Sequence, residues 1–455
     1  MATSPPHRPI KRVVLVHGYS VYQLNSYGKI PALLESQYAT PNILLSEYVS
    51  LDDAVNCDDL AMALEIQVGG AWNLNADDLA ETAFVCHSTG AIVTRRWILN
   101  RFAQGLPLPS HLITVAGANH GSSLAQVGRT AIARVFRWIG QDGRQVGERV
   151  LADLDYGSTF LWTLNAEWLD AWNNKGLANL VYCFSFGGDK HGASLLLNIP
   201  EFPDVPGWQF LEPGSDSIVR VSGANLNYSF VTGDAVAGVL SQPRKIAPRA
   251  AHLVIPGWTH GGVLGGVQSA ADPPFVALHD ALQVVSDADY ASLAVQWQQQ
   301  TDAWSAQNSS EVNSTIAFRL RDNVGRPIND SWILLQDPTG SATNMSGSLL
   351  PNQPIQNEAE HCAVSFYVNY QKFAQAPSHI VQIEAHSGSP NISYVPVKYP
   401  SAPGAQFVHP NEFTYLDVTI PRNVSGTYNV VSLSANPSVG ASWPPFTTAP
   451  GPTRS

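Results

Sequence analysis

Residues 81–96 read ETAFVCHSTGAIVTRR, and this stretch decides the fold. The apolar run from Ala83 to Cys86 predicts a short buried strand, and apolar positions recur at helical spacing after Gly90. The chain must turn abruptly between the two, and the turn places the hydroxyl of Ser88 at its apex. A serine on a tight turn between a strand and a helix is typical of a nucleophile elbow, in which the following amide binds an anion.

The predicted elbow departs from the full Gly-x-Ser-x-Gly pattern at one position. Cys86 stands where the first glycine belongs, and Gly90 supplies the second. Because a thiol is larger than a hydrogen atom, we expect either that the helix stands slightly further from the strand or that the turn relaxes. On this stretch alone, an ordinary strand-turn-helix with a solvated serine remains the alternative.

Strands and helices alternate on both sides of the elbow. The predicted strands are apolar runs of the kind that parallel sheets bury on both faces. They cover residues 12–16, 43–48, 83–86, 112–116, 180–186 and 252–255. Helical spacing between them, for example over 27–38 and 58–68, predicts a doubly wound, mostly parallel α/β sheet with helices on both faces.

Residues 121–176 interrupt this alternation with a long, mostly helical insertion. It is rich in large apolar side chains, among them Phe160, Trp162, Trp168 and Trp172. Two interpretations stay open. The segment forms amphipathic core helices, or it forms a cap that covers the carboxyl edge of the sheet and offers a slot to an apolar chain.

The composition changes beyond Trp304. A Ser/Asn-rich linker over 307–314 precedes short alternating runs separated by Gly/Pro turns. About seven strands at this spacing predict a β-sandwich. We therefore divide the chain into an α/β domain over 1–306, a β-sandwich over 307–435 and a loose Pro/Ser/Gly-rich tail over 436–455.

The charge balance argues against nucleic acid as a partner. The chain has 455 residues and a formal net charge of −11, whereas a protein that binds nucleic acid needs a basic surface.

No run of about 18 apolar residues occurs, so we expect no transmembrane segment. No signal peptide is visible at the N-terminus, which leaves open a cytoplasmic location and a secreted protein whose signal has been removed.

Nothing in the sequence predicts a metal or a cofactor. The four cysteines are far apart and lack CxxC spacing, so we expect neither a disulfide nor a zinc site: Cys57, Cys86, Cys183 and Cys362. The acids at 52–59 predict a solvated helix start. Neither a Walker loop nor a dinucleotide fingerprint occurs.

Partners for Ser88 follow it in the order, acid and then histidine, that a nucleophile elbow requires. A serine becomes nucleophilic when a base removes its proton, and a carboxylate orients that base. Asp216 lies in GSDSIVR and His260 lies in the small-residue loop PGWTHGG, so we predict a catalytic triad of Ser88, Asp216 and His260. Asp189 is the rival acid and His252 the rival base, and their flanking residues rank both behind.

The order of these motifs resembles that of an α/β-hydrolase of the lipase and esterase type. The chain is similar in pattern to bacterial lipases and to GPI inositol-deacylase-like hydrolases, over about residues 12–285. The motifs that carry the resemblance are VLVHG (14–18), HSTG (87–90), ANHGS (118–122), DLDYGSTFL (153–161), Asp216 in SDSIV, and His260 followed by glycine.

The resemblance also implies roles for residues around the triad. The main-chain N–H groups of Tyr19 and Thr89 are the matching donors of an oxyanion hole. His17, His87 and His120 match positions at which the family carries histidine without chemistry, so we expect them to pack loops.

We therefore expect a cofactor-independent serine hydrolase that cleaves a small-molecule, lipid or polymeric carboxylic ester through an acyl-enzyme. The same triad also serves an amidase, a polyester depolymerase or an acyltransferase. Outside enzymes, the alternative is a binding protein with an inactive hydrolase-like domain. The sequence leaves open whether the β-sandwich binds substrate, binds a surface or shields the α/β domain.

Overall fold

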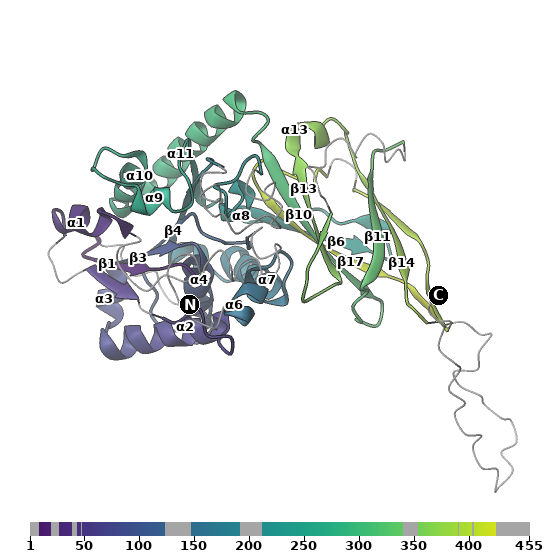
Figure 1. The fold of residues 1–455 in the computed structure, drawn as a ribbon, viewed down its shortest axis with the longest axis horizontal. Coiled ribbons are helices and arrows are strands. Elements are labelled where there is room, and N and C mark those ends of the chain that lie inside the picture. Colours follow the sequence, from purple (N-terminus) through teal and green to yellow (C-terminus); the bar gives the residue numbers. More distant parts are fainter. Residues whose placement is uncertain are drawn as a thin grey trace, which may run out of the picture.

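The protein is described by a computed structural model. It describes residues 9–19, 27–38, 43–46, 48–122, 147–191, 212–339, 354–389, 391–402 and 405–424. An α/β part that carries most of the helices lies on the left of Figure 1, and a part built from long strands lies on the right. The predicted tail over 436–455 and the end of the predicted sandwich lie outside the described residues.

The α/β part is built on a parallel sheet. Among the described residues its strand order is β2-β1-β3-β4-β5-β9, and each neighbouring pair is parallel. The strands are β1 (Arg12–Val16), β2 (Ile43–Ser46), β3 (Thr82–His87), β4 (His111–Val115), β5 (Tyr182–Gly188) and β9 (Ala251–Ile255). Alternate side chains enter two separate cores: Val14 and Val16 pack in one, and Val13 and Leu15 pack in the other. This burial on both faces explains the continuous apolar runs.

Helices cover both faces of the sheet, as predicted. One core contains side chains of α2, α4, α6 and α7, and the other contains side chains of α1, α9, α10 and α11. The helices are α1 (Ile30–Glu35), α2 (Cys57–Ile66), α3 (Ala76–Ala80), α4 (Thr89–Ala103), α6 (Glu148–Leu154), α7 (Thr159–Asn174), α8 (Val221–Ala224), α9 (Gly262–Gly265), α10 (Pro273–Leu282), α11 (Asp287–Gln307) and α13 (Tyr370–Phe373).

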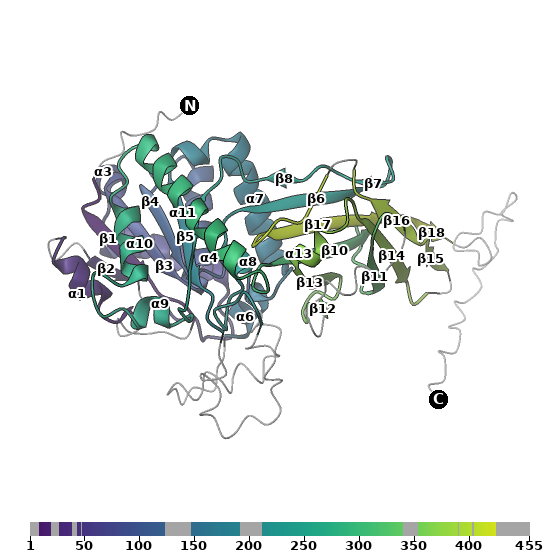
Figure 2. The ribbon, with the colours of Figure 1, turned by 90° about the horizontal axis from the view of Figure 1, so that it is seen from above.

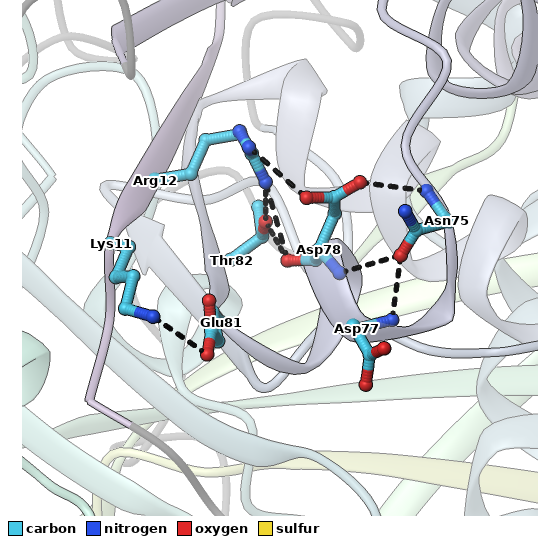
Figure 3. A network of polar contacts seen from close by, with 7 residues as sticks. All are labelled: Lys11, Arg12, Asn75, Asp77, Asp78, Glu81 and Thr82. Carbon is cyan, nitrogen blue, oxygen red and sulfur yellow. Dashed lines mark hydrogen bonds and ion pairs between the residues drawn. The ribbon is translucent and has the colours of Figure 1, made fainter.

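A polar network fixes the start of β1 against the turn from α3 into β3 (Figure 3). Asn75 caps α3: its side chain accepts from the amide of Asp78, and the Asp78 carboxylate accepts from the amide of Asn75. The guanidinium of Arg12 lies 3.3 Å from the same carboxylate, and Lys11 pairs with Glu81 at 3.0 Å. Capping of this kind contributes about 1 kcal/mol, and a surface ion pair contributes about as much at most.

The described helices of the insertion belong to the core. α7 packs against α4, and Trp162 meets the ring of Tyr415 edge-on at a centroid distance of 5.0 Å. Trp168 and Trp172 are buried in the same core. Two interpretations were open for this segment, and residues 147–176 fit the first, that of amphipathic core helices. Residues 123–146 lie outside the described part.

The second part of the molecule contains two facing sheets, as a sandwich requires. Among the described residues one sheet has the order β12-β13-β10-β17-β6-β7, with β8 beside β6, and the other has the order β11-β14-β16. Their apolar faces share one core, which includes Ile316, Phe318, Val381 and Ile383. The strands are β6 (Tyr228–Asp234), β7 (Val239–Leu240), β8 (Arg244–Lys245), β10 (Asn313–Asp322), β11 (Asp330–Gln336), β12 (Ile355–Gln356), β13 (Ala363–Asn369), β14 (Ile380–His386), β15 (Ile392–Tyr394), β16 (Val397–Pro400), β17 (Phe413–Ile420) and β18 (Arg422–Val424).

The boundary predicted at 306 does not match the strand pairing. β6, coloured teal in Figure 2, runs beside β17 and pairs with it in parallel from Phe413↔Tyr228 to Val418↔Gly233. The segment 228–245 thus leaves the α/β part, joins the second sheet and returns to form β9. Alternation within a strand does not indicate which of two sheets the strand joins, so this crossing has no signal in the local sequence.

No helix within the described ranges combines the length and the apolar character that crossing a membrane requires.

Candidate active site

Ser88 lies on the turn between β3 and α4, as predicted. It is the residue before the first turn of α4, and its backbone has φ +52° and ψ −121°. A side chain with positive φ is strained by about 1–3 kcal/mol and persists only where the surrounding structure holds it. The backbone therefore turns sharply at Ser88, in a conformation that the packing around it must maintain.

Two glycines allow the chain to pack closely around the elbow. A Cβ atom on Gly90 would lie 2.6 Å from the carbonyl oxygens of both Val16 and His17, and a Cβ atom on Gly18 would lie 2.9 Å from Cβ of Ser88. Neither position has room for a larger residue. The end of β1 consequently lies directly against the start of α4.

Cys86 fits at the position where the elbow pattern has glycine. Its thiol is fully buried and donates a hydrogen bond to Oγ1 of Thr94 at 3.2 Å, one turn into α4. Burial raises the pKa of this thiol to about 12, so it stays protonated. Cys86 thus packs the helix against the strand and carries no nucleophilic thiolate.

The structure brings Asp216 and His260 together. Nδ1 of His260 lies 2.9 Å from Oδ2 of Asp216, and the amide of His260 donates to the carbonyl of Asp216 at 3.0 Å. The other carboxylate oxygen, Oδ1, accepts from the amides of Ile218 and Val219 at 3.0 and 2.7 Å. Both residues are buried, so the carboxylate has a fixed orientation and holds Nδ1–H of the imidazole.

His87 connects the elbow to the loop of His260. Its Nε2 lies 3.1 Å from the carbonyl oxygen of His260, and the two imidazole rings are 4.7 Å apart between centroids. Because a carbonyl only accepts, Nε2 of His87 carries the proton. Burial, aided by the neighbouring His260, lowers the pKa of His87 to about 3, so this donor is neutral. The resemblance gave His87 only a packing role, and its contact with residue 260 has no signal in the local sequence.

The predicted nucleophile, Ser88, and the predicted base, His260, do not form a hydrogen bond with each other. Within the described part of the chain, neither the Ser88 hydroxyl nor Nε2 of His260 has a hydrogen-bond partner. The contacts of the adjacent His87 place the Ser88 turn and the His260 loop side by side. Hydrogen bonds of this kind are often long before substrate binds.

The two predicted oxyanion donors come from the start of α4 and from the loop after β1. Thr89 is the first helical residue of α4, so its N–H has no preceding helical carbonyl to bind. Tyr19 follows Gly18 and is buried with the core at the end of β1. The positive end of the α4 dipole adds to the attraction for an anion at Thr89.

The rival acid and the rival base have other partners. Asp189 accepts from the amide of Gly257 at 2.6 Å and from the indole of Trp304 at 2.7 Å. His252 bonds the hydroxyl of Ser185 through Nδ1 at 2.9 Å, and burial lowers its pKa to about 3. Both side chains are thus engaged away from the pair formed by Asp216 and His260.

Two further histidines hold loops. Nδ1 of His17 donates to the carbonyl of Gly18 at 2.7 Å, and its Nε2 accepts from the amide of Tyr48 at 3.3 Å. His120 contacts the hydroxyl of Tyr415 and the carbonyl of Asn225 at 3.1 and 2.9 Å. These contacts agree with the expected packing roles.

The described residues contain neither a cluster of metal ligands nor a disulfide. They contain no group of three or more His, Cys, Asp or Glu side chains that could hold a metal ion. The four cysteines lie in this part of the chain, and each is free and buried. The acids near α2 act as predicted for a helix start, because Asp59 forms a capping box with Asn56.

Sequence reasoning missed a buried ion pair beside Asp216. The guanidinium of Arg220 binds both carboxylate oxygens of Glu212, at 2.9 and 2.7 Å. Arg220 is fully buried, and it directly follows the apolar pair Ile218-Val219. An arginine next to buried apolar residues requires a buried acidic partner, so its place in the sequence could have predicted this ion pair.

Comparison with known proteins gives a match at the level of structure. No protein-family model and no curated protein matches the sequence. The structure is similar to that of phospholipase PlaB from Legionella pneumophila, with a TM-score of 0.80 and 26% sequence identity over 95% of this chain and 98% of that one. It is also similar to PlaB in complex with thio-NAD, with a TM-score of 0.78 and 27% identity over 94% of this chain and 97% of that one.

Proposed function

We propose that this chain, whose fold is that of an α/β-hydrolase of the lipase and esterase type, cleaves carboxylic esters with Ser88, His260 and Asp216. The hydrogen bond between Asp216 and His260, in a loop that contacts the strained turn of Ser88, carries this proposal. The fold is shared with a phospholipase along almost the whole chain, which supports a lipid ester as the first substrate to test.

The reaction follows from the roles of these groups. Oγ of Ser88 attacks the ester carbonyl, and its proton passes to Nε2 of His260. The carboxylate of Asp216 holds Nδ1–H and stabilises the imidazolium. The N–H groups of Thr89 and Tyr19 bind the oxyanion of the tetrahedral intermediate.

Collapse of that intermediate breaks the bond to the alcohol. His260 returns its proton to the leaving oxygen, and the acyl group stays on Ser88. A water molecule then attacks the acyl-enzyme, His260 takes a proton from it, and the acid leaves as Ser88 regains its proton. No cofactor is needed to balance these steps.

The first experiment compares the unaltered chain with Ser88→Ala. We expect the unaltered chain to hydrolyse a series of nitrophenyl esters and phospholipids and to react with a fluorophosphonate probe. Ser88→Ala should lose the probe reaction completely and lower kcat by about 10³-fold or more, because the nucleophile is gone. Ser36→Ala is the matched control, since Ser36 is an exposed serine at the end of α1.

The result also decides between the alternatives. Equal probe labelling in both chains would contradict the role of Ser88, and no labelling in either would favour an inactive binding protein. Adding alcohol or amine acceptors and measuring the product ratio separates hydrolysis from acyl transfer. Amide and polyester substrates separate the remaining reactions of the same triad.

A further inference from the structure

We propose that the C-terminal β part positions the catalytic acid, through contacts of Tyr367, Asn313 and Glu311 with the loop that carries Asp216. This inference rests on the proposed function, because it assigns a role to the surroundings of that same acid. We call residues 212–220 the acid loop. An internal ion pair closes the loop, and residues at the second sheet hold it in place.

The acid loop is closed on itself at its two ends. The ion pair between Glu212 and Arg220 joins the first and last residues. Ser215 and Arg220 form a β-bridge, and the amide of Val221 donates to the carbonyl of Gly214 at 2.8 Å. Asp216 lies inside this closed loop, so a displacement of the loop displaces the carboxylate.

Residues of β10 and β13, and the turn before β10, hold the backbone just before Asp216. The hydroxyl of Tyr367 donates to the carbonyl of Pro213 at 2.6 Å and lies 3.1 Å from the carbonyl of Gly214. The side-chain amide of Asn313 donates to the same Pro213 carbonyl at 3.1 Å. The carboxylate of Glu311 accepts from the amide of Gly214 at 2.5 Å.

Gly214 shows how close this contact is. Its φ is +68°, and a Cβ atom there would lie 2.2 Å from the carbonyl oxygen of Glu311 and 3.0 Å from the hydroxyl of Tyr367. Glycine is therefore required both by the backbone conformation and by the lack of space. The acid loop packs directly against the C-terminal part.

A buried cation joins the two parts as well. The guanidinium carbon of Arg220 lies 4.1 Å from the ring centroid of Tyr367 and 4.6 Å from that of Tyr156. Arg220 and Tyr367 are fully buried. The negative faces of aromatic rings attract a cation, and the attraction is stronger in a dry site. The closing ion pair of the acid loop is thus held between one ring from each part.

The orientation of Asp216 matters for the rate because its carboxylate stabilises the imidazolium form of His260, which arises in the transition state. A shift of the acid loop weakens that stabilisation in the transition state and leaves ground-state binding of the ester unchanged. The loss should therefore appear in kcat and not in KM. The acidic limb of the rate profile should move to lower pH, because the imidazolium becomes less favourable.

The experiment compares Tyr367→Phe with Tyr399→Phe in the full chain. Both tyrosines are buried in the C-terminal part and donate to a backbone carbonyl, that of Pro213 and that of Thr419 respectively. We expect Tyr367→Phe to lower kcat about tenfold, with KM within about twofold and the acidic limb at lower pH. Tyr399→Phe should keep the kcat and the pH profile of the unaltered chain.

A second pair keeps the inference testable if Tyr367→Phe folds poorly. Glu311→Ala removes the acceptor for the Gly214 amide, whereas Glu311→Gln keeps an oxygen at that place. We expect the alanine variant to lower kcat about tenfold and the glutamine variant to restore most of it. Each rate is compared at equal folded fraction, measured by thermal unfolding.

Two results would overturn the inference. One is an unaltered kcat and pH profile in both Tyr367→Phe and Glu311→Ala. The other is a loss of activity that follows thermal stability equally in Tyr367→Phe and Tyr399→Phe, which means a purely structural role. Failure of the proposed function looks different, since the unaltered chain would then lack both hydrolysis and probe labelling.

Discussion

At the scale of single residues, the site depends on backbone geometry as much as on side-chain chemistry. Ser88 keeps a positive φ because the chain on both sides of it is packed against the end of β1. The strain is offset by burial around the turn, and the turn is consequently sensitive to small increases in volume.

Gly90→Ala tests this sensitivity. The new methyl group would meet two carbonyl oxygens at 2.6 Å, so we expect a loss of about 2–3 kcal/mol in unfolding free energy and a larger loss in kcat, because α4 must move away from Ser88. Gly70→Ala is the control, since Gly70 lies at the end of the α2 segment with open space around it. Urea unfolding and ester hydrolysis measure both effects. Equal stability of the two variants would contradict the packing argument.

The sequence predicted the residues with a local signature and missed those defined by distant contacts. The position of Ser88 followed from an apolar strand and a small-residue turn, and Asp216 and His260 followed from chain order and their flanking residues. The bond from His87 to the carbonyl of His260, and the contact of Tyr367 with Pro213, join residues far apart in the chain. No local pattern encodes such contacts.

At the scale of elements, the parallel sheet was predictable and the strand assignment at residues 228–245 was not. Buried strands that alternate with helices predict a parallel sheet with helices on both faces, and the parallel pairing of β1, β3, β4, β5 and β9 confirms this prediction. β6 has the same apolar character as those strands, and only its pairing with β17 reveals the sheet it joins. The large apolar residues of α7 were predicted to pack in a core or a cap. That this core also contains side chains of β6 and β17 was not predicted.

The start of α7 gives a prediction at this scale. The carboxylate of Glu360, from the loop before β13, accepts from the amide and the hydroxyl of Thr159 at the first turn. Glu360→Ala should lower the free energy of unfolding by about 1 kcal/mol, because helix N-terminal donors and the positive dipole end lose an acceptor. Glu358→Ala is the control, since Glu358 is exposed and bonds Asp155 only through its amide. A kcat that falls with Glu360→Ala would show that α7 also affects the site.

At the scale of the whole molecule, buried histidines set the response to acid. Burial lowers the pKa of His87 and of His252 to about 3, and lowers that of His120 well below its ordinary value. A group whose pKa is depressed by folding stabilises above its unfolded pKa of about 6.5, and that contribution is lost as pH falls toward 3. Asp153 acts in the opposite sense between about 4 and 6, because burial raises its pKa to about 6.

Burial also lowers the pKa of His379 and of His409 and raises that of Asp280, so histidines with a lowered pKa outnumber carboxylates with a raised one and the fold should weaken in mild acid. Each neutral histidine costs about 1.4 kcal/mol per pH unit below 6.5, and we expect the urea midpoint to fall steadily from pH 7 to pH 5. His252→Gln removes one of these histidines, so the slope of the unfolding free energy against pH should fall by the equivalent of about one proton. His252 lies outside the proposed triad. An unchanged slope in this variant would contradict the assignment.

The contacts of the acid loop with β10 and β13 have a consequence for biosynthesis. The chain leaves the ribosome from its N-terminus, so Ser88, Asp216 and His260 all emerge before β10, β13 and β17 have been translated. A nascent chain therefore carries the three side chains of the proposed triad while the partners of the acid loop are still missing. With the positioning contacts that we propose, Asp216 gains its working orientation only after β10 and β13 have been translated, and synthesis of these strands delays hydrolysis.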